Sequence, residues 1–214
     1  MTDDPLDPAT DDAAERDAGS PAEPARWHRA IAATFTEKVL GASDWDVPTP
    51  VAEWTARDVV RHLVTWLPGF LGAGTQIELA AGPSVDDDPV GAWQAHVEAV
   101  QGLLDDPQFA EMPYQSSMFG ELTVAEAINQ FYTADIFMHT WDLARATGQP
   151  DRLDAQTCAH MLAGMSDMES VIRQSGQFGE QQPVREGSDA TDRLIAFIGR
   201  DPYWAPPTSA PATG

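Results

Sequence analysis

The sequence predicts an all-α protein, a four-helix bundle followed by additional C-terminal helices. Three observations lead to this prediction. Apolar residues recur at three- and four-residue steps through most of the chain, the period of a helix that is buried on one face. Segments that alternate apolar and polar residues, as half-buried strands do, are scarce. Capping residues stand before two of the apolar stretches, and glycines stand after two of them.

The first three helices are placed by their apolar stripes. In "WHRAIAATFTEKVLGA" the apolar positions fall four residues apart and the pattern stops at Gly41; they are Trp27, Ile31, Phe35 and Val39. Thr55 and Asp58 resemble a capping box, with Asp in place of the usual Glu, at the start of "TARDVVRHLVTWLPGFLGAG". Residues 89–105 predict a third helix, whose stripe consists of Val90, Trp93, Val97, Val100 and Leu104.

The longest predicted helix covers residues 123–147. Thr123 and Glu126 form a capping box at its start, and Gly148 follows its last turn. Residues 154–174 predict a fifth helix and residues 189–199 a short sixth one.

The two ends of the chain differ in composition from the body. Residues 1–25 contain eight acids, one arginine and four prolines. Such a segment cannot bury enough apolar surface to offset its chain entropy, so we expect a disordered acidic tail. The same reasoning predicts a disordered tail over residues 208–214. Residues 26–207 are therefore expected to form the single folded domain.

Composition argues against several classes of protein. The 214 residues carry a formal charge of −22 and only one lysine, a surface that repels phosphate backbones and anionic lipids. We therefore expect no nucleic-acid partner and no membrane partner. No stretch of 18 apolar residues is present, and the N-terminus has no secretory signal pattern. With Cys158 as the single cysteine, a cytoplasmic location is expected.

The fourth helix carries two ionisable residues on its apolar stripe. The inward positions are expected to be Val124, Ile128, Phe131, Asp135, Met138 and His139. Asp135 occupies a position where an aliphatic side chain would pack better, and a buried carboxylate without a partner costs several kcal/mol. His139 lies one turn further on the same face. The pair is either a buried salt bridge or part of a ligand site.

A third residue completes a candidate metal site. His62 adjoins the apolar stripe of the second helix, which consists of Val59, Leu63, Trp66 and Phe70. Two imidazoles and one carboxylate with open positions form a site for a divalent metal. A histidine beside an apolar face is more often a hydrogen-bonded core residue, and spacing alone does not bring His62 to Asp135 and His139.

Other polar residues have simpler interpretations. Arg145 is expected to pair with Asp142, three residues before it on the same helix. His28 and His160 are interpreted as ordinary helix-face residues. His96, three residues after Trp93, is kept as a reserve ligand.

Three motifs together resemble the mycothiol-dependent maleylpyruvate isomerase family of the DinB-like superfamily, and most closely its short metal-binding branch. They are "PTPVAEWTARDVVRHLV", "DIFMHTWDLARATG" and "ATDRLIAFIGRDPYWAPP", and the resemblance spans about residues 26–207. It implies a DinB-like four-helix bundle that binds zinc, with nickel as the alternative, through His62, Asp135 and His139. The isomerase itself has Glu at the position of Asp135.

The resemblance also implies a function, with one limit. The isomerase has an α/β domain after its bundle, whereas the 66 residues after Gly148 read as helix and tail, so maleylpyruvate isomerisation is not carried over. What remains is a metal-dependent transferase or isomerase that uses mycothiol, or a similar small thiol, on a small electrophile. The alternative is a non-catalytic metal-binding bundle, linked to stress.

The remaining expectations concern the thiol and the partners. Arg57 and Arg61, one turn apart beside His62, would hold an anionic group of the thiol co-substrate, unless they form a solvated helix face. No catalytic residue is predicted. The partners are the thiol and the electrophile, and a homodimer is expected.

Overall fold

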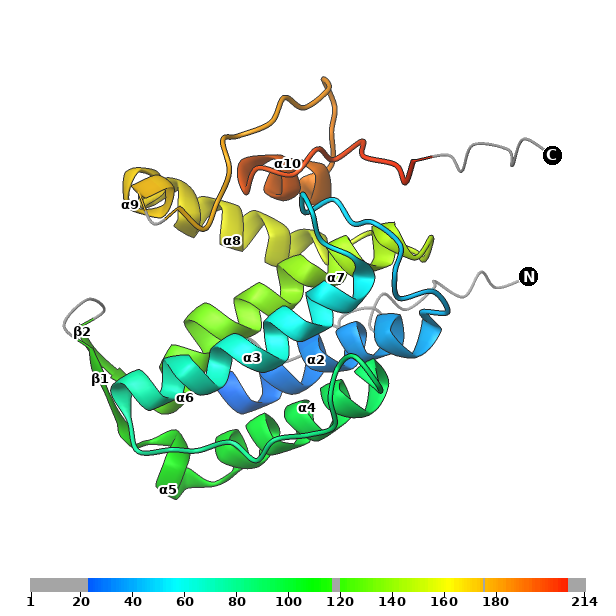
Figure 1. Ribbon diagram of the computed structural model, residues 1–214. Helices are drawn as coiled ribbons and strands as arrows, with labels where there is room; N and C mark the ends of the chain where they lie inside the picture. Colours follow the sequence, from blue (N-terminus) through cyan, green and yellow to red (C-terminus); the bar gives the residue numbers. More distant parts are fainter. Residues whose placement is uncertain (1–22, 117–119, 175, 208–214) are drawn as a thin grey trace, which may run out of the picture.

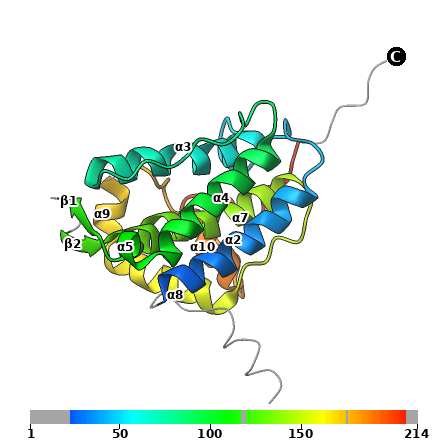
Figure 2. The same cartoon turned by 90° about the horizontal axis from the view of Figure 1, so that it is seen from below.

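The computed structural model describes residues 23–116, 120–174 and 176–207. Four long helical segments form a bundle (Figure 1): α2 (Pro24–Gly41), α3 (Ala56–Gly74), α4 (Pro89–Asp105), and a composite fourth helix made of α6 (Val124–Ala127), η1 (Ile128–Thr133) and α7 (Ala134–Ala146). Helix α2 packs against α4 and α7, and α3 packs against α7 and α4. Figure 2, the view from below, also shows α2 and α4 side by side.

Short elements complete the fold. Helix α5 (Pro107–Ala110) leads to strand β1 (Pro113–Ser116), which pairs antiparallel with β2 (Gly120–Thr123). Helices α8 (Ala155–Asp167), α9 (Glu169–Gln174) and α10 (Ala190–Phe197) lie on the side of α7 that faces away from α4 (Figure 1). Within the described residues β1 and β2 make the one sheet. The prediction of a mostly helical, all-α fold is confirmed.

The capping signals mark helix ends correctly. The Asp58 carboxylate accepts hydrogen bonds from the backbone N–H and the hydroxyl of Thr55, at 2.8 and 2.7 Å. At the start of the fourth helix the Thr123 N–H donates to Glu126, and the Glu126 N–H donates to the Thr123 hydroxyl. Gly148 follows α7 with φ 69°, a left-handed conformation that favours glycine.

The fourth helix differs from the prediction in its middle. Residues Ile128–Thr133 form a π-helix rather than an α-helix, so each hydrogen bond there spans five residues instead of four. The wider turn rotates the following residues relative to a 3.6-residue period. As a result Tyr132 is fully buried, whereas Phe131, predicted to face inward, is partly exposed.

Three predicted boundaries also differ. The fifth helix is two helices, because α8 ends at Asp167 and α9 begins at Glu169. Helix α10 is a little shorter than the predicted range 189–199. Helix α2 begins at Pro24, inside the predicted tail, since proline is well suited to the first turn of a helix. The rest of that tail, residues 1–22, and residues 208–214 lie outside the described residues.

The core lies between the four long helical segments and continues into α8 and α10. Its largest fully buried side chains are Trp93, Trp141, Tyr132, Phe35, Leu63, Leu67, Leu71, Ile128, Ile136, Leu143, Leu194 and Ile195. Among the described helices, we find none with both the length and the apolar character that a membrane span requires.

Candidate metal centre

The structure brings together the three residues predicted as metal ligands. His62 comes from α3, and Asp135 and His139 come from successive turns of α7. Their ligand atoms all lie within 4.8 Å of one another. Nε2 of His62 is 2.9 Å from Oδ2 of Asp135, and Nε2 of His139 is 3.4 Å from Oδ1. The carboxylate therefore stands between the two imidazoles.

The donor set fits a divalent metal ion. Bonds of 2.0–2.1 Å in a tetrahedral site place neighbouring donor atoms about 3.3 Å apart, close to the two nitrogen–oxygen distances found here. Two imidazole nitrogens and one carboxylate oxygen suit zinc and similar ions, and three protein ligands leave a position for another molecule.

Exposure differs among the three ligands and gives the site a direction. The side chain of His139 is 4% exposed, whereas those of Asp135 and His62 are 20% and 31% exposed. The site is thus anchored in the core through His139 and opens toward solvent beside His62. The His62 side of the site is therefore partly in contact with solvent.

The surroundings of Asp135 keep it ionised. Burial raises the pKa of its carboxyl, but the nearby charge of His139 and the hydrogen bond from His62 outweigh burial, so the pKa lies below its ordinary value. The indole N–H of Trp66 also donates to Oδ2, at 3.0 Å. An ionised carboxylate is the form that binds a cation.

A buried acid behind His139 is a feature that the sequence did not reveal. Oδ2 of Asp142 is 2.8 Å from Nδ1 of His139, and the Asp142 side chain has no exposed surface. Arg200 donates to the same carboxylate at 3.1 Å. Burial raises the pKa of the Asp142 carboxyl. The Arg200 guanidinium and His139 have the larger, opposite effect, so the pKa lies below its ordinary value. The pair is a histidine–carboxylate arrangement typical of metal sites.

The predicted pairing of Arg145 with Asp142 is wrong. Nε of Arg145 lies 3.0 Å from Asp151, and its guanidinium donates to the carbonyl of Pro202. Local spacing suggested Arg145, while the actual partner, Arg200, comes from the chain after α10. Asp142 thereby joins the segment after α10 to the candidate metal site.

Aromatic rings surround the triad. The ring of Trp54 stacks on His139, with centroids 5.6 Å apart and planes at 19°, and its centroid lies 5.0 Å from that of His62. The ring centroid of Trp66 lies 6.1 Å from that of His62, and Trp66 contacts Phe70 in turn. These rings limit the rotation of the imidazoles and place partly exposed apolar surface beside the opening.

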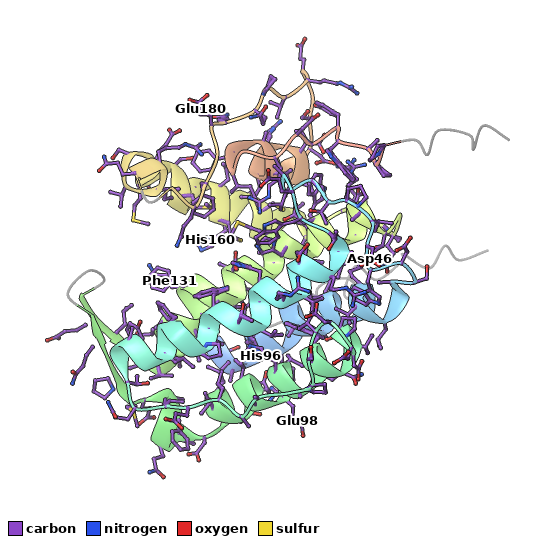
Figure 3. The ribbon with its side chains drawn as sticks, viewed as in Figure 1. Asp46, His96, Glu98, Phe131, His160 and Glu180 are labelled. Atoms are coloured by element: carbon purple, nitrogen blue, oxygen red, sulfur yellow. The ribbon has the colours of Figure 1, made fainter. Side chains whose placement is uncertain are left out.

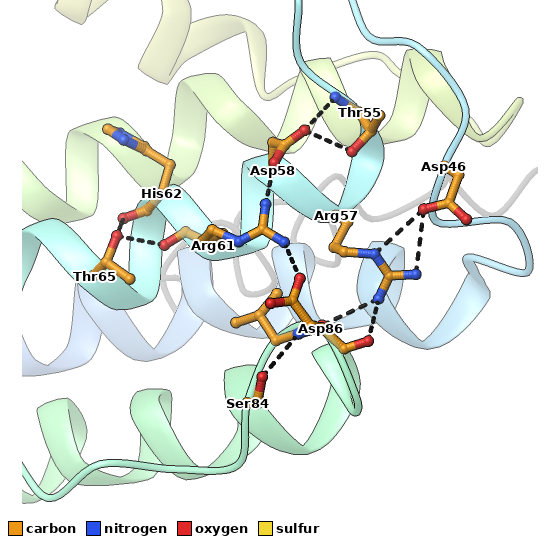
Figure 4. Close-up of polar contacts among 10 residues, drawn as sticks. Asp46, Thr55, Arg57, Asp58, Arg61, His62, Thr65, Ser84 and Asp86 are labelled. Carbon is orange, nitrogen blue, oxygen red and sulfur yellow. Dashed lines mark hydrogen bonds and ion pairs between the residues drawn. The ribbon is translucent and has the colours of Figure 1, made fainter.

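Arg57 and Arg61 have partners of their own (Figure 4). The Arg57 guanidinium donates to Asp46 and to the carbonyls of Val85 and Asp86. Arg61 forms ion pairs with Asp58 and Asp86, and its guanidinium extends from α3 in a different direction from the His62 ring. The structure therefore does not bring these arginines to the triad, and an anion would compete with three carboxylates for them.

The other histidines lie away from the triad. His28, predicted to be an ordinary helix-face residue, has no exposed surface, so that interpretation is wrong. His96, the reserve ligand, is 5% exposed and points from α4 into the bundle, whereas His160 lies exposed on α8 (Figure 3). The ring of His96 lies beside Tyr132, at 5.7 Å.

Comparison with known proteins gives relatives but no function. No protein-family model matches the chain, and no solved structure matches it. Two uncharacterized proteins of Mycobacterium tuberculosis, Rv0738 of strain H37Rv and MT0763 of strain CDC 1551, are each 30% identical to it over 164 residues. The matched region covers 72% of this chain and 83% of each relative. The chain therefore belongs to the same family as these two mycobacterial proteins.

Proposed function

We propose that this protein is a divalent-metal-dependent transferase or isomerase that uses a small thiol on a small electrophile. The observation that carries the proposal is the meeting of His62, Asp135 and His139 in a half-open site. Zinc is the proposed metal, with nickel as the alternative. The choice of mycothiol as the thiol depends on the motif resemblance described above.

The chemistry follows from the donor set. A divalent cation at this position would favour a thiolate over a thiol, and the thiolate is the nucleophilic form. In the transferase reaction, the thiol sulfur forms a bond to the electrophilic carbon, the leaving group departs with its bonding electrons, and the thiol proton passes to solvent. In the isomerase reaction the sulfur adds and is later eliminated, so the thiol is regenerated.

The residues of the chain prepare the site for this role. With a metal bound, the Asp142 carboxylate would accept from Nδ1 of His139 and keep a proton there, so that the Nε2 lone pair would face the metal. The indole N–H of Trp66 orients Asp135. The aromatic surface of Trp54, Trp66 and Phe70 is suited to the apolar part of a substrate.

A non-catalytic metal-binding bundle is the second candidate. The observation that favours it is that both oxygens of Asp135 already have partners: Oδ2 faces His62 and Trp66, and Oδ1 faces His139. A site that is so fully constrained also suits a metal that is held rather than used.

The test replaces two ligands with apolar residues. Asp135→Leu/His139→Leu should fold, because replacing a buried ion pair with apolar side chains is commonly tolerated, but it should lose metal and thiol consumption. Wild type should hold about one divalent ion per chain, as one three-ligand site implies. The measurements are circular dichroism, elemental analysis and loss of free mycothiol with a panel of electrophiles. His160→Leu, on the exposed face of α8, is the matched control.

The outcomes separate the alternatives. A double variant that keeps metal and activity would refute any role for the triad. Metal-loaded wild type that consumes no thiol with any electrophile would favour the non-catalytic candidate. Loss of both metal and activity in the variant, with both kept in His160→Leu, supports the enzyme.

A further inference from the structure

Three of the buried polar atoms that have no hydrogen-bond partner among the described residues belong to neighbouring side chains of the core. They are Nε2 of His28, Nε2 of His96 and the hydroxyl oxygen of Tyr132. The exposed fractions of these residues are 0%, 5% and 0%. Each comes from a different element, α2, α4 and η1 respectively. None of the three belongs to the metal triad.

The three side chains are neighbours. The ring centroid of Tyr132 lies 6.0 Å from that of His28, with the rings stacked, and 5.7 Å from that of His96. Nδ1 of His28, the other nitrogen of this ring, is 3.1 Å from the Thr133 hydroxyl, so one end of the imidazole has a hydrogen-bond partner. The three side chains therefore form a small polar cluster inside an otherwise apolar core.

Both imidazoles are neutral at physiological pH. Burial and the nearby His96 lower the pKa of His28 to about 4, and burial lowers the pKa of His96 to about 4. Each neutral ring offers one N–H donor and one lone pair, and the tyrosine hydroxyl can donate or accept.

Native proteins pair almost all buried polar groups, and they use ordered water where no protein group is within reach. We propose that His28, His96 and Tyr132 form an internal water-binding site, the inner polar site, which holds one or more water molecules. A buried water typically makes about three hydrogen bonds, and this site offers three groups from three helical segments.

A neutral ligand suits this site better than an ion. The three groups are uncharged and include no carboxylate, so a divalent cation would have no compensating charge among them. An anion would enter the core of a chain whose formal charge is −22. Water both donates and accepts, which matches a group of side chains that can do either.

Trp66 connects the inner polar site to the candidate metal centre. The rings of Tyr132 and Trp66 are in edge contact at 5.5 Å, and the Trp66 N–H donates to Asp135. Water bound to Tyr132 would help to hold η1 in place, and η1 leads directly into the helix that carries Asp135 and His139.

The test is a crystal structure together with oxygen-17 magnetic relaxation dispersion, which counts long-lived internal waters. The proteins are wild type, Tyr132→Phe, His28→Leu/His96→Leu and, as a control, His160→Leu. We expect wild-type density for a water within hydrogen-bond distance of at least two of the three atoms. The internal-water count should fall in the histidine double variant and stay the same in His160→Leu.

Several outcomes would overturn the proposal. One is an empty site in wild type, and another is a peak with an anomalous signal, which would show a metal ion. A third is a water count that is unchanged in both Tyr132→Phe and the double variant. If the double variant does not fold, Tyr132→Phe decides, because it removes only one oxygen atom and should lower the count or the occupancy of the site.

Discussion

Lowering the pH should destabilise this protein through His28 and His96. An unfolded histidine has a pKa of about 6.5, whereas both buried rings titrate at about 4. Between these two values the unfolded chain takes up protons that the folded protein does not, so the free energy of unfolding falls as the pH falls. Above about pH 6.5 both rings are neutral in the folded and in the unfolded chain, so they do not lower the free energy of unfolding. Well below pH 4 both rings are protonated in either state, and the loss of stability has reached its full size.

The magnitude follows from the size of the shift. A difference of one pKa unit corresponds to about 1.4 kcal/mol, so each histidine should remove about 2 kcal/mol of stability at pH 5. At pH 4 the loss would be about 3 kcal/mol for each ring, and it would approach about 3.4 kcal/mol well below pH 4. Because His96 contributes to the shift of His28, the sum for the pair is an upper value. It is still a large part of the roughly 5–15 kcal/mol that stabilises a typical domain.

The assay is urea unfolding of wild type, His28→Leu and His160→Leu at several pH values between 7.5 and 5. The leucine at position 28 cannot be protonated, so this variant should lose about 2 kcal/mol less than wild type between pH 7.5 and 5. The comparison uses only the change with pH, so a shift in stability at neutral pH does not affect it. The exposed control should follow wild type. Parallel curves for wild type and His28→Leu would refute the reasoning.

Two further predictions concern the metal site and the end of α7. Asp142→Asn should weaken metal binding by about 10–100-fold, because His139 loses the carboxylate that orients it; competition with a chelator measures this, and Asp151→Asn should bind metal as wild type does. Gly148→Ala should lower the free energy of unfolding by about 1–2 kcal/mol, because φ is 69° there. By contrast, Gly102→Ala, in α4 with open space around it, should raise stability by up to about 1 kcal/mol. Thermal unfolding measures both glycine variants, and equal shifts would contradict the argument from φ.

Much of the fold could be predicted because helix signals are local. The boxes at Thr55 and Thr123 involve residues three apart, and Gly148 ends α7 through its own backbone conformation. Asp135 and His139 could be proposed as partners for the same reason, since they lie one turn apart on one helix. His62 lies on a different helix, and only the resemblance of three motifs linked it to them.

What could not be predicted depends on contacts between distant segments. Arg200 reaches Asp142 across 58 residues, whereas local spacing on the helix points to Arg145. The burial of His28 could have been found from α2 itself, because His28 precedes Ile31 and Phe35 by three and seven residues and so lies on the same helical face. Its partners Tyr132 and Thr133, in η1, could not be found in this way. Nothing in the residues of η1 indicates a π-helix, and this is why Phe131 rather than Tyr132 was expected to face the core.

The π-helix at η1 has a consequence for how the fourth helix can change over time. One residue corresponds to about 100° of rotation in an α-helix, and a turn that closes over five residues accommodates one more residue than a regular one. The half that begins with the Thr123 box and the half that carries Asp135 therefore keep their relative rotation although one extra residue lies between them. A chain shorter by one residue here could form an uninterrupted helix, and its ligand pair would still face His62. A single-residue insertion or deletion at this point can thus be absorbed without re-aiming the ligands.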